Sequence, residues 1–321
     1  MNSNTPQHYQ DSNFEYPKHE NAIDLRELFS VIWQGKWIIL AITFIFAVGA
    51  VFYSLSLPNI YKSHALLAPA ESQQQNGALA SLAGQFGGLA SMAGINLGAG
   101  SNDKTQEAIA VMKSREFIGT FIEKHQILPE LMAAKNWNQD SNVISYDSEL
   151  YNAKEQKWVR KVKAPFKAEP SQQEAYKVFM KNFTVSTNKN NGMVTVAIEN
   201  ISPNLAAQWV TWLVEDINQT MKQRDVAEAT RGTQFLEQQL AKTNIADIRT
   251  VLYQLMEQAA KTIMFANVRQ EYAFKTIDKA YIPEEKFSPK RSLVVILFTM
   301  LGLVFSTIYC VIRYVVRKIK K

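Results

Sequence analysis

The sequence contains little of what most catalytic and metal sites require. It has one cysteine, Cys310, which lies inside an apolar run, and four histidines without ligand spacing. This composition argues against a disulfide framework and a thiolate metal site. The motifs G-x-x-x-x-G-K-[ST], G-x-S-x-G and H-E-x-x-H are also missing. We therefore expect no cofactor, no metal and no enzyme, although a glycosidase built on two distant carboxylates stays open.

Two long runs without a charged residue dominate the hydropathy pattern. They cover residues 37–57 and 293–312, and each is long enough to cross a hydrocarbon core of roughly 30 Å. The first run lies behind a polar tail and is followed by Leu57-Pro58-Asn59, which offers no A-x-A cleavage site. We therefore predict two transmembrane helices and no cleaved signal peptide.

The last residues, RYVVRKIKK, are basic and contain no acid, so the positive-inside rule predicts a cytoplasmic C-terminus. Two spans then return the N-terminus to the same side. The basic residues behind the net charge of +6 are thus explained by contact with the membrane, and we expect no nucleic-acid partner. The expected parts are a cytoplasmic tail with a juxtamembrane amphipathic segment (1–36), a first span (37–57), a periplasmic domain (58–291), a second span (292–312) and a basic cytoplasmic tail (313–321).

A glycine-rich segment without charge follows the first span, over residues 72–102. It contains two G-x-x-x-G spacings, one formed by Gly84 and Gly88 and the other by Gly94 and Gly98. Such spacing allows close backbone approach when it lies on helices. The segment is interpreted either as a mobile apolar loop or as a surface packed between subunits or facing the membrane.

A basic stretch with aromatic residues lies within residues 136–170, which lack clear periodicity. Such a stretch is usually a solvated face, but it can also bind an anionic sugar or a lipid headgroup. The candidate contacts are Lys157, Arg160, Lys161 and Lys163.

The rest of the central region mixes helical and strand patterns. Asp103 and Gln106 form an N-cap-like pair that predicts one helix over residues 107–125. Ser171 to Glu174 is a capping box, and residues 183–200 predict a β-hairpin. Ser202-Pro203 predicts the start of a long helix to about Ala241, and a second helical seam follows Thr243-Asn244. We therefore expect an α+β domain whose long helices form a membrane-distal projection, anchored by two transmembrane helices.

Taken together, these parts resemble the Wzz-type chain-length determinant proteins, the polysaccharide co-polymerases of bacterial surface glycans. The resemblance covers nearly the whole chain and is strongest in LYQLMEQAAKTIMFANVRQEYAFKTIDKAYIPEEKFSPKRS, residues 252–292, and in IDLRELFSVIWQGKW before the first span. The family's proline segment before the second span corresponds to Pro283, Ser288, Pro289, Lys290 and Arg291. These prolines either stiffen the link to the span or simply mark a helix start.

The resemblance implies a ring-like homo-oligomer in the bacterial inner membrane, of the kinase-free class. It would act with the O-antigen polymerase on lipid-linked polysaccharide and set the modal chain length of lipopolysaccharide O-antigen without catalysis. Two other functions stay open. One is an envelope export adaptor that joins an inner-membrane transporter to an outer channel, and the other is a periplasmic polysaccharide hydrolase.

Overall fold

The computed structural model describes residues 33–70 and 101–319. The chain divides into two compact units, one with the two apolar helices and one formed by Leu57–Pro289. The juxtamembrane amphipathic segment lies almost entirely outside the described residues. The glycines predicted to pack between subunits, Gly84, Gly88, Gly94 and Gly98, also lie outside the described residues.

The first unit is a pair of helices, α2 (Lys36–Ser56) and α10 (Arg291–Ile319). Both are long and apolar enough to cross a membrane. The two helices pack on each other, and the rings of Phe46 and Phe305 stack at 6.3 Å between centroids. A Cβ added at Gly302 would lie 2.6 Å from the Cβ of Phe46. Glycine is therefore needed for this close approach of the helices.

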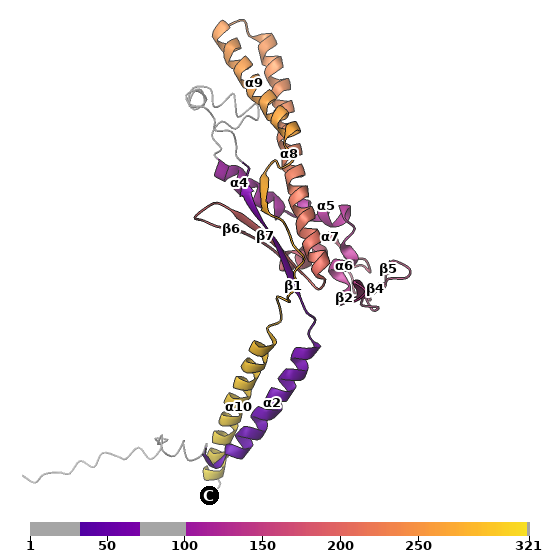
Figure 1. Cartoon of the computed structure of the whole chain (residues 1–321), viewed down its shortest axis with the longest axis vertical. Helices are drawn as coiled ribbons and strands as arrows, with labels where there is room; N and C mark the ends of the chain where they lie inside the picture. The colour runs from indigo at the N-terminus through magenta and orange to yellow at the C-terminus, as the bar shows by residue number, and fades with distance from the viewer. Residues whose placement is uncertain (1–32, 71–100, 320–321) are drawn as a thin grey trace, which may run out of the picture. The chain divides into compact units, whose positions relative to one another are not determined.

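The second unit is built on a four-stranded antiparallel sheet in the order β6-β7-β1-β8 (Figure 1). The strands are β1 (Tyr61–Pro69), β6 (Phe183–Thr187), β7 (Val194–Asn200) and β8 (Phe274–Asp278). Burial along β1 alternates, with Ser63, Ala65 and Leu67 buried and their neighbours only partly covered. One face of the sheet therefore packs against the core, as antiparallel sheets commonly do.

Helices cover that face. The long helix α8 (Pro203–Lys242) contacts β1 and β7, and the shorter helices α5 (Arg115–Lys124), α6 (Leu128–Met132) and α7 (Gln172–Asn182) pack around it. The predicted apolar stripe of α8 is confirmed, because Trp209, Leu213 and Ile217 are buried. The core also contains the fully buried side chains of Phe121, Phe179 and Phe274.

The distal part of α8 forms a hairpin with α9 (Ala246–Val268), which Figure 1 shows extending beyond the sheet. A small second core joins the two helices, formed by Leu236, Leu252 and Leu255. The mixed architecture with long helices is the predicted α+β class. The predicted cap at Thr243-Asn244 is displaced, because Ile245 holds the N-cap position without a side-chain hydrogen bond.

One prediction about the helices is wrong. The helix predicted over residues 107–125 is two helices, α4 (Ser101–Met112) and α5, and α4 begins before the predicted cap at Asp103. The break occurs because Ser114 acts as an N-cap, with its Oγ accepting from Phe117 N at 3.2 Å. The change of direction still lets the predicted apolar residues of both helices reach the same core, and Ile109, Met112, Phe117 and Phe121 are all buried.

The region without periodicity contains two small hairpins that the sequence did not reveal. One joins β2 (Ala134–Asn138) to β3 (Val143–Tyr146), and the other joins β4 (Tyr151–Asn152) to β5 (Lys157–Trp158). Tyr151 is the one buried residue of these four short strands, so they lack the buried face by which a strand is recognised.

Candidate functional site

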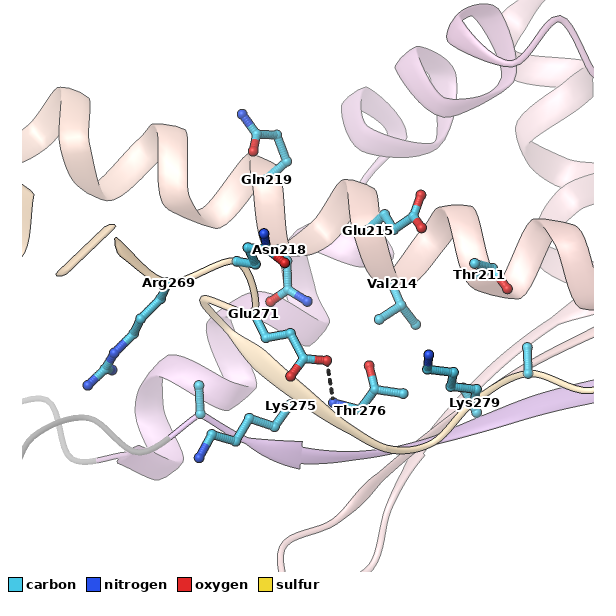
Figure 2. A pocket seen from close by; sticks show the side chains of 14 residues that line it. Thr211, Val214, Glu215, Asn218, Gln219, Arg269, Glu271, Lys275, Thr276 and Lys279 are labelled. Carbon is cyan, nitrogen blue, oxygen red and sulfur yellow. Dashed lines mark hydrogen bonds between the residues drawn. The ribbon is translucent and has the colours of Figure 1, made fainter. Parts of the chain in front are cut away.

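A cleft of about 780 Å³, with apolar walls and charged side chains at its mouth, lies where the base of α8 faces β8 and the chain that returns from α9 (Figure 2). Helix α8 contributes one wall, the segment after α9 a second, and β1 and β8 the floor. The lining residues are Ala65, Ala70, Thr211, Val214, Glu215, Asn218, Gln219, Arg269, Gln270, Glu271, Lys275, Thr276, Lys279 and Ala280. The cleft lies wholly within the second unit.

Asn218 fixes the geometry of this cleft. Its Oδ1 accepts from the backbone N–H groups of Ala273 at 2.7 Å and Phe274 at 2.8 Å, and its Nδ2 donates to Phe274 O at 3.1 Å. The side chain is buried, and these bonds satisfy backbone groups that burial would otherwise leave unpaired. Asn218 thereby ties the start of β8 to α8.

Two further contacts hold the returning segment. The hydroxyl of Tyr272 donates to Asp225 Oδ2 at 2.7 Å, and Lys104 Nζ on α4 donates to the same oxygen at 2.9 Å. Burial, together with the bond to Asp225, raises the pKa of the Tyr272 phenol far above its usual value, so this proton stays in place. The backbone N–H of Thr276 donates to Glu271 Oε1 at 2.9 Å, the bond drawn in Figure 2.

The mouth of the cleft carries polar side chains that are not bonded to other described residues of the domain. Glu215 and Gln219 project from α8, while Lys275 and Lys279 come from β8 and the residues after it. All four are exposed, and none makes a hydrogen bond or ion pair within the described part of the chain. The cleft therefore offers ammonium donors, a carboxylate acceptor and an amide that does both.

The predicted basic stretch does not form one uniform surface. Arg160 makes a bidentate ion pair with Glu174, with Nη1 to Oε1 at 2.8 Å and Nη2 to Oε2 at 2.9 Å. Its Nε donates to the carbonyl oxygens of Lys167 and Ala168. Arg160 thus holds a loop against α7, whereas Lys157, Lys161 and Lys163 are exposed.

The same ion pair supports the capping box predicted at Ser171. Glu174 N donates to Ser171 Oγ at 3.3 Å, and Ser171 N donates to Glu174 Oε2 at 3.0 Å. Hydrogen bonds from Arg160 first, and then from the Ser171 backbone, lower the pKa of Glu174 to about 2. The capping box is therefore confirmed, and its carboxylate stays charged at neutral pH.

The proline segment lies beside the start of β1. Ile60 N donates to Ser288 O at 2.9 Å, and Phe287 N donates to Ile60 O at 2.8 Å, so the first and last residues of the domain form a bridge. Pro283 is buried and Pro289 partly buried, while Lys290 is exposed. The bridge joins the two ends of the domain, and no local sequence signal predicts this pairing.

The glycines predicted as subunit contacts are not placed by the structure. Gly84, Gly88, Gly94 and Gly98 all belong to residues 71–100, which the described part of the chain leaves out. None of them can therefore be assigned to the cleft or to any other surface, and their role stays a prediction.

A charged cluster on another side of α8 joins that helix to α5. The buried carboxylate of Asp216 accepts a hydrogen bond from Lys124 Nζ through Oδ1, and its Oδ2 lies 2.9 Å from His125 Nε2. The imidazole of His125 stacks on the indole of Trp212 at 4.2 Å between centroids. Every partner in this cluster is a side chain of the domain, so its geometry suits an internal brace between helices. Among the described residues, no group of three histidine, cysteine, aspartate or glutamate side chains is placed to hold a metal.

Two known families match parts of the sequence. Residues 21–125 match the family of the Wzz chain length determinant protein. Residues 237–315, which contain α9, β8 and most of α10, match the G-rich domain on putative tyrosine kinase. No curated protein matches the sequence. The resemblance found in residues 252–292 thus falls within a second matched region.

Two solved structures are similar to this chain. A full-length bacterial polysaccharide co-polymerase shares 12% identity at a TM-score of 0.41, with 92% of this chain and 99% of that chain covered. A fragment of WzzB, a polysaccharide co-polymerase from Salmonella Typhimurium, shares 13% identity at a TM-score of 0.28, with 72% and 100% covered.

Proposed function

We propose that this protein regulates the modal chain length of a surface polysaccharide, namely lipopolysaccharide O-antigen. It does so as a non-catalytic oligomeric scaffold in the bacterial inner membrane that acts with the O-antigen polymerase on lipid-linked polysaccharide. The observation that carries the proposal is the chain length determinant match over residues 21–125, combined with two apolar helices that flank one α+β domain.

The proposed topology follows from charge. The basic residues after the second apolar run place both termini in the cytoplasm, with spans at 37–57 and 292–312. Residues 58–291 then form the periplasmic domain, and the proline segment is the last part of this domain before the second span.

The scaffold role is supported by exposed apolar side chains on α9. Tyr253 is 51% exposed, Met264 53% and Val268 76%, and exposed apolar patches mark surfaces that contact other proteins. We place subunit contacts on this surface, with further contacts at the glycines of the predicted spacings, Gly84, Gly88, Gly94 and Gly98. The exposed lysines of the basic stretch are a second, separate candidate for contact with glycan or headgroups, at Lys157, Lys161 and Lys163.

Deletion of the gene tests the proposal. Surface polysaccharide from the parent, the deletion strain and a complemented strain is separated on a gel. A length regulator predicts loss of the preferred band cluster, with short and random lengths remaining. An unchanged ladder contradicts the proposal, and complete loss of exported polysaccharide favours the export adaptor.

A further inference from the structure

We propose that the cleft between α8 and β8 is a binding subsite for a segment of polysaccharide. This inference rests on the proposed function, because it names the ligand that the domain would hold. Its physical basis is the set of unpartnered side chains at the mouth: Glu215, Gln219, Lys275 and Lys279.

The chemistry of these side chains matches a hydroxyl-rich ligand. Each sugar hydroxyl both donates and accepts, so a site that holds several needs donors and acceptors close together. The amines of Lys275 and Lys279 donate, the carboxylate of Glu215 accepts, and the amide of Gln219 does both. Thr211 adds a hydroxyl to the same wall.

The lining is unlike the centre of a protein interface. Interface cores are depleted in lysine and glutamate and enriched in aromatic residues and methionine. In the cleft the charged residues are Glu215, Arg269, Glu271, Lys275 and Lys279, and no aromatic residue lines it. Exposed apolar side chains of the domain lie on α9, at Tyr253 and Met264, and also at Ile277 on β8 and Tyr281 after it. The charged lining is what favours a saccharide over a second copy of the chain in the cleft.

The cleft is also held in shape before any ligand arrives. Asn218 fixes the start of β8 through three hydrogen bonds, and Glu271 holds Thr276 N. The backbone of the cleft therefore needs little ordering, and the main entropic cost of binding is that of fixing the exposed side chains at the mouth.

One such cleft binds weakly, but an oligomer presents it once per subunit. A repeating glycan that reaches two clefts binds its second site at high effective concentration, which can raise affinity by about 10²–10⁴. Chains shorter than the distance between clefts gain nothing. The cleft would thus make the affinity of the assembly for glycan depend on glycan length.

The experiment uses the full chain in lipid nanodiscs. The probe is delipidated polysaccharide released by mild acid from the cells that carry the gene, separated into long chains and fragments of one or two repeat units. Affinity is measured by isothermal titration calorimetry for the parent and for Lys275→Ala/Lys279→Ala. We expect the double variant to lose at least about tenfold in affinity for long chains, the effect of losing two charge-assisted hydrogen bonds.

Two further double variants serve as comparisons. Lys189→Ala/Lys242→Ala removes two exposed lysines elsewhere and should bind within about twofold of the parent, since surface substitutions away from a site have small effects. Lys161→Ala/Lys163→Ala tests the basic stretch. If only this variant loses affinity, glycan binds there and the cleft proposal is wrong.

Assembly size is measured on the same samples by mass photometry. If the cleft variant falls apart while the Lys189/Lys242 control stays assembled, the cleft is a subunit contact and the proposal is overturned. Unchanged glycan affinity in an assembled cleft variant also overturns it. If the cleft proposal alone is wrong, deletion of the gene still changes the distribution of chain lengths. If the proposed function is wrong, the ladder is unchanged on deletion.

Discussion

The base of the domain and the distal α8–α9 hairpin are stabilised very differently. At the base, fully buried aromatic side chains from several segments pack on the sheet, among them Trp209, Phe121 and Phe179. The distal hairpin has a smaller core, in which Leu236, Leu252 and Leu255 are buried and five partly buried apolar side chains pack against them. Helix α8 therefore runs through two regions of the domain that differ in stability, because buried apolar contacts set local unfolding free energies.

The largest expected effect comes from the base. Trp209→Ala removes a fully buried indole and should lower the free energy of unfolding of the whole domain by about 3–5 kcal/mol. Trp209→Phe is the matched control, because it keeps most of the volume and removes an indole N–H that has no partner among the described residues. Urea denaturation of the two variants gives the comparison. Equal stability of the two variants would contradict this account of the base.

The second largest loss of stability is expected at Asn218, where the chain returns from the hairpin to the base. Asn218→Ala leaves three buried backbone groups of Ala273 and Phe274 without partners, and should cost about 3 kcal/mol, the upper end for unpaired groups. Gln219→Ala, at an exposed neighbouring position, should leave stability within about 0.5 kcal/mol. Thermal unfolding checks both variants, and a similar loss in each would show that Asn218 has no special role.

A smaller and more local effect is expected in the hairpin. Leu252→Ala should destabilise by about 2 kcal/mol, the low end for this substitution, because few neighbours surround it. Hydrogen exchange should rise in α9 and the distal half of α8 while the sheet stays protected. Tyr253→Ala, on the exposed side, should change exchange little. Faster exchange throughout the sheet of the Leu252 variant would show that base and hairpin unfold as one unit.

The smallest effect concerns the Arg160–Glu174 pair. The pair is partly buried, with the Arg160 and Glu174 side chains 12% and 19% exposed, and it should contribute about 1 kcal/mol, the upper end for ion pairs near a surface. Because the pKa of Glu174 is lowered from 4.5 to about 2, the stabilisation is present above pH 4.5 and is lost as the pH falls toward 2. The stability difference between the parent and Arg160→Ala should therefore shrink over this interval in urea titrations. A difference that stays constant with pH would contradict the ion pair, and Lys161→Ala should show no such difference at any pH.

Local signals made much of the fold predictable. Ser202-Pro203 marks the start of α8, Ser171 with Glu174 marks α7, and the β6–β7 turn contains Gly192 with a φ of +70°, which favours glycine. The break at Ser114 was missed because the apolar spacing runs on through it. Proteins place such breaks where the core requires a change of direction, which one sequence does not show.

The candidate site was not predictable. Glu215 and Lys275 lie far apart in the chain and line the same cleft only because the chain returns to the sheet after α9. Asn218 carried no signal either, since a lone asparagine on a helix is usually solvated. The basic stretch was conspicuous in sequence, yet the structure uses Arg160 to hold a loop.

The central claim, that this chain sets polysaccharide length, is tested most directly by returning the gene to its deletion strain. The number of repeat units per chain is then measured by mass spectrometry of polysaccharide released from the cells. The account predicts a broad distribution of short chains without the gene and a narrow distribution around one preferred length when it is restored. The same distribution with and without the gene would contradict it.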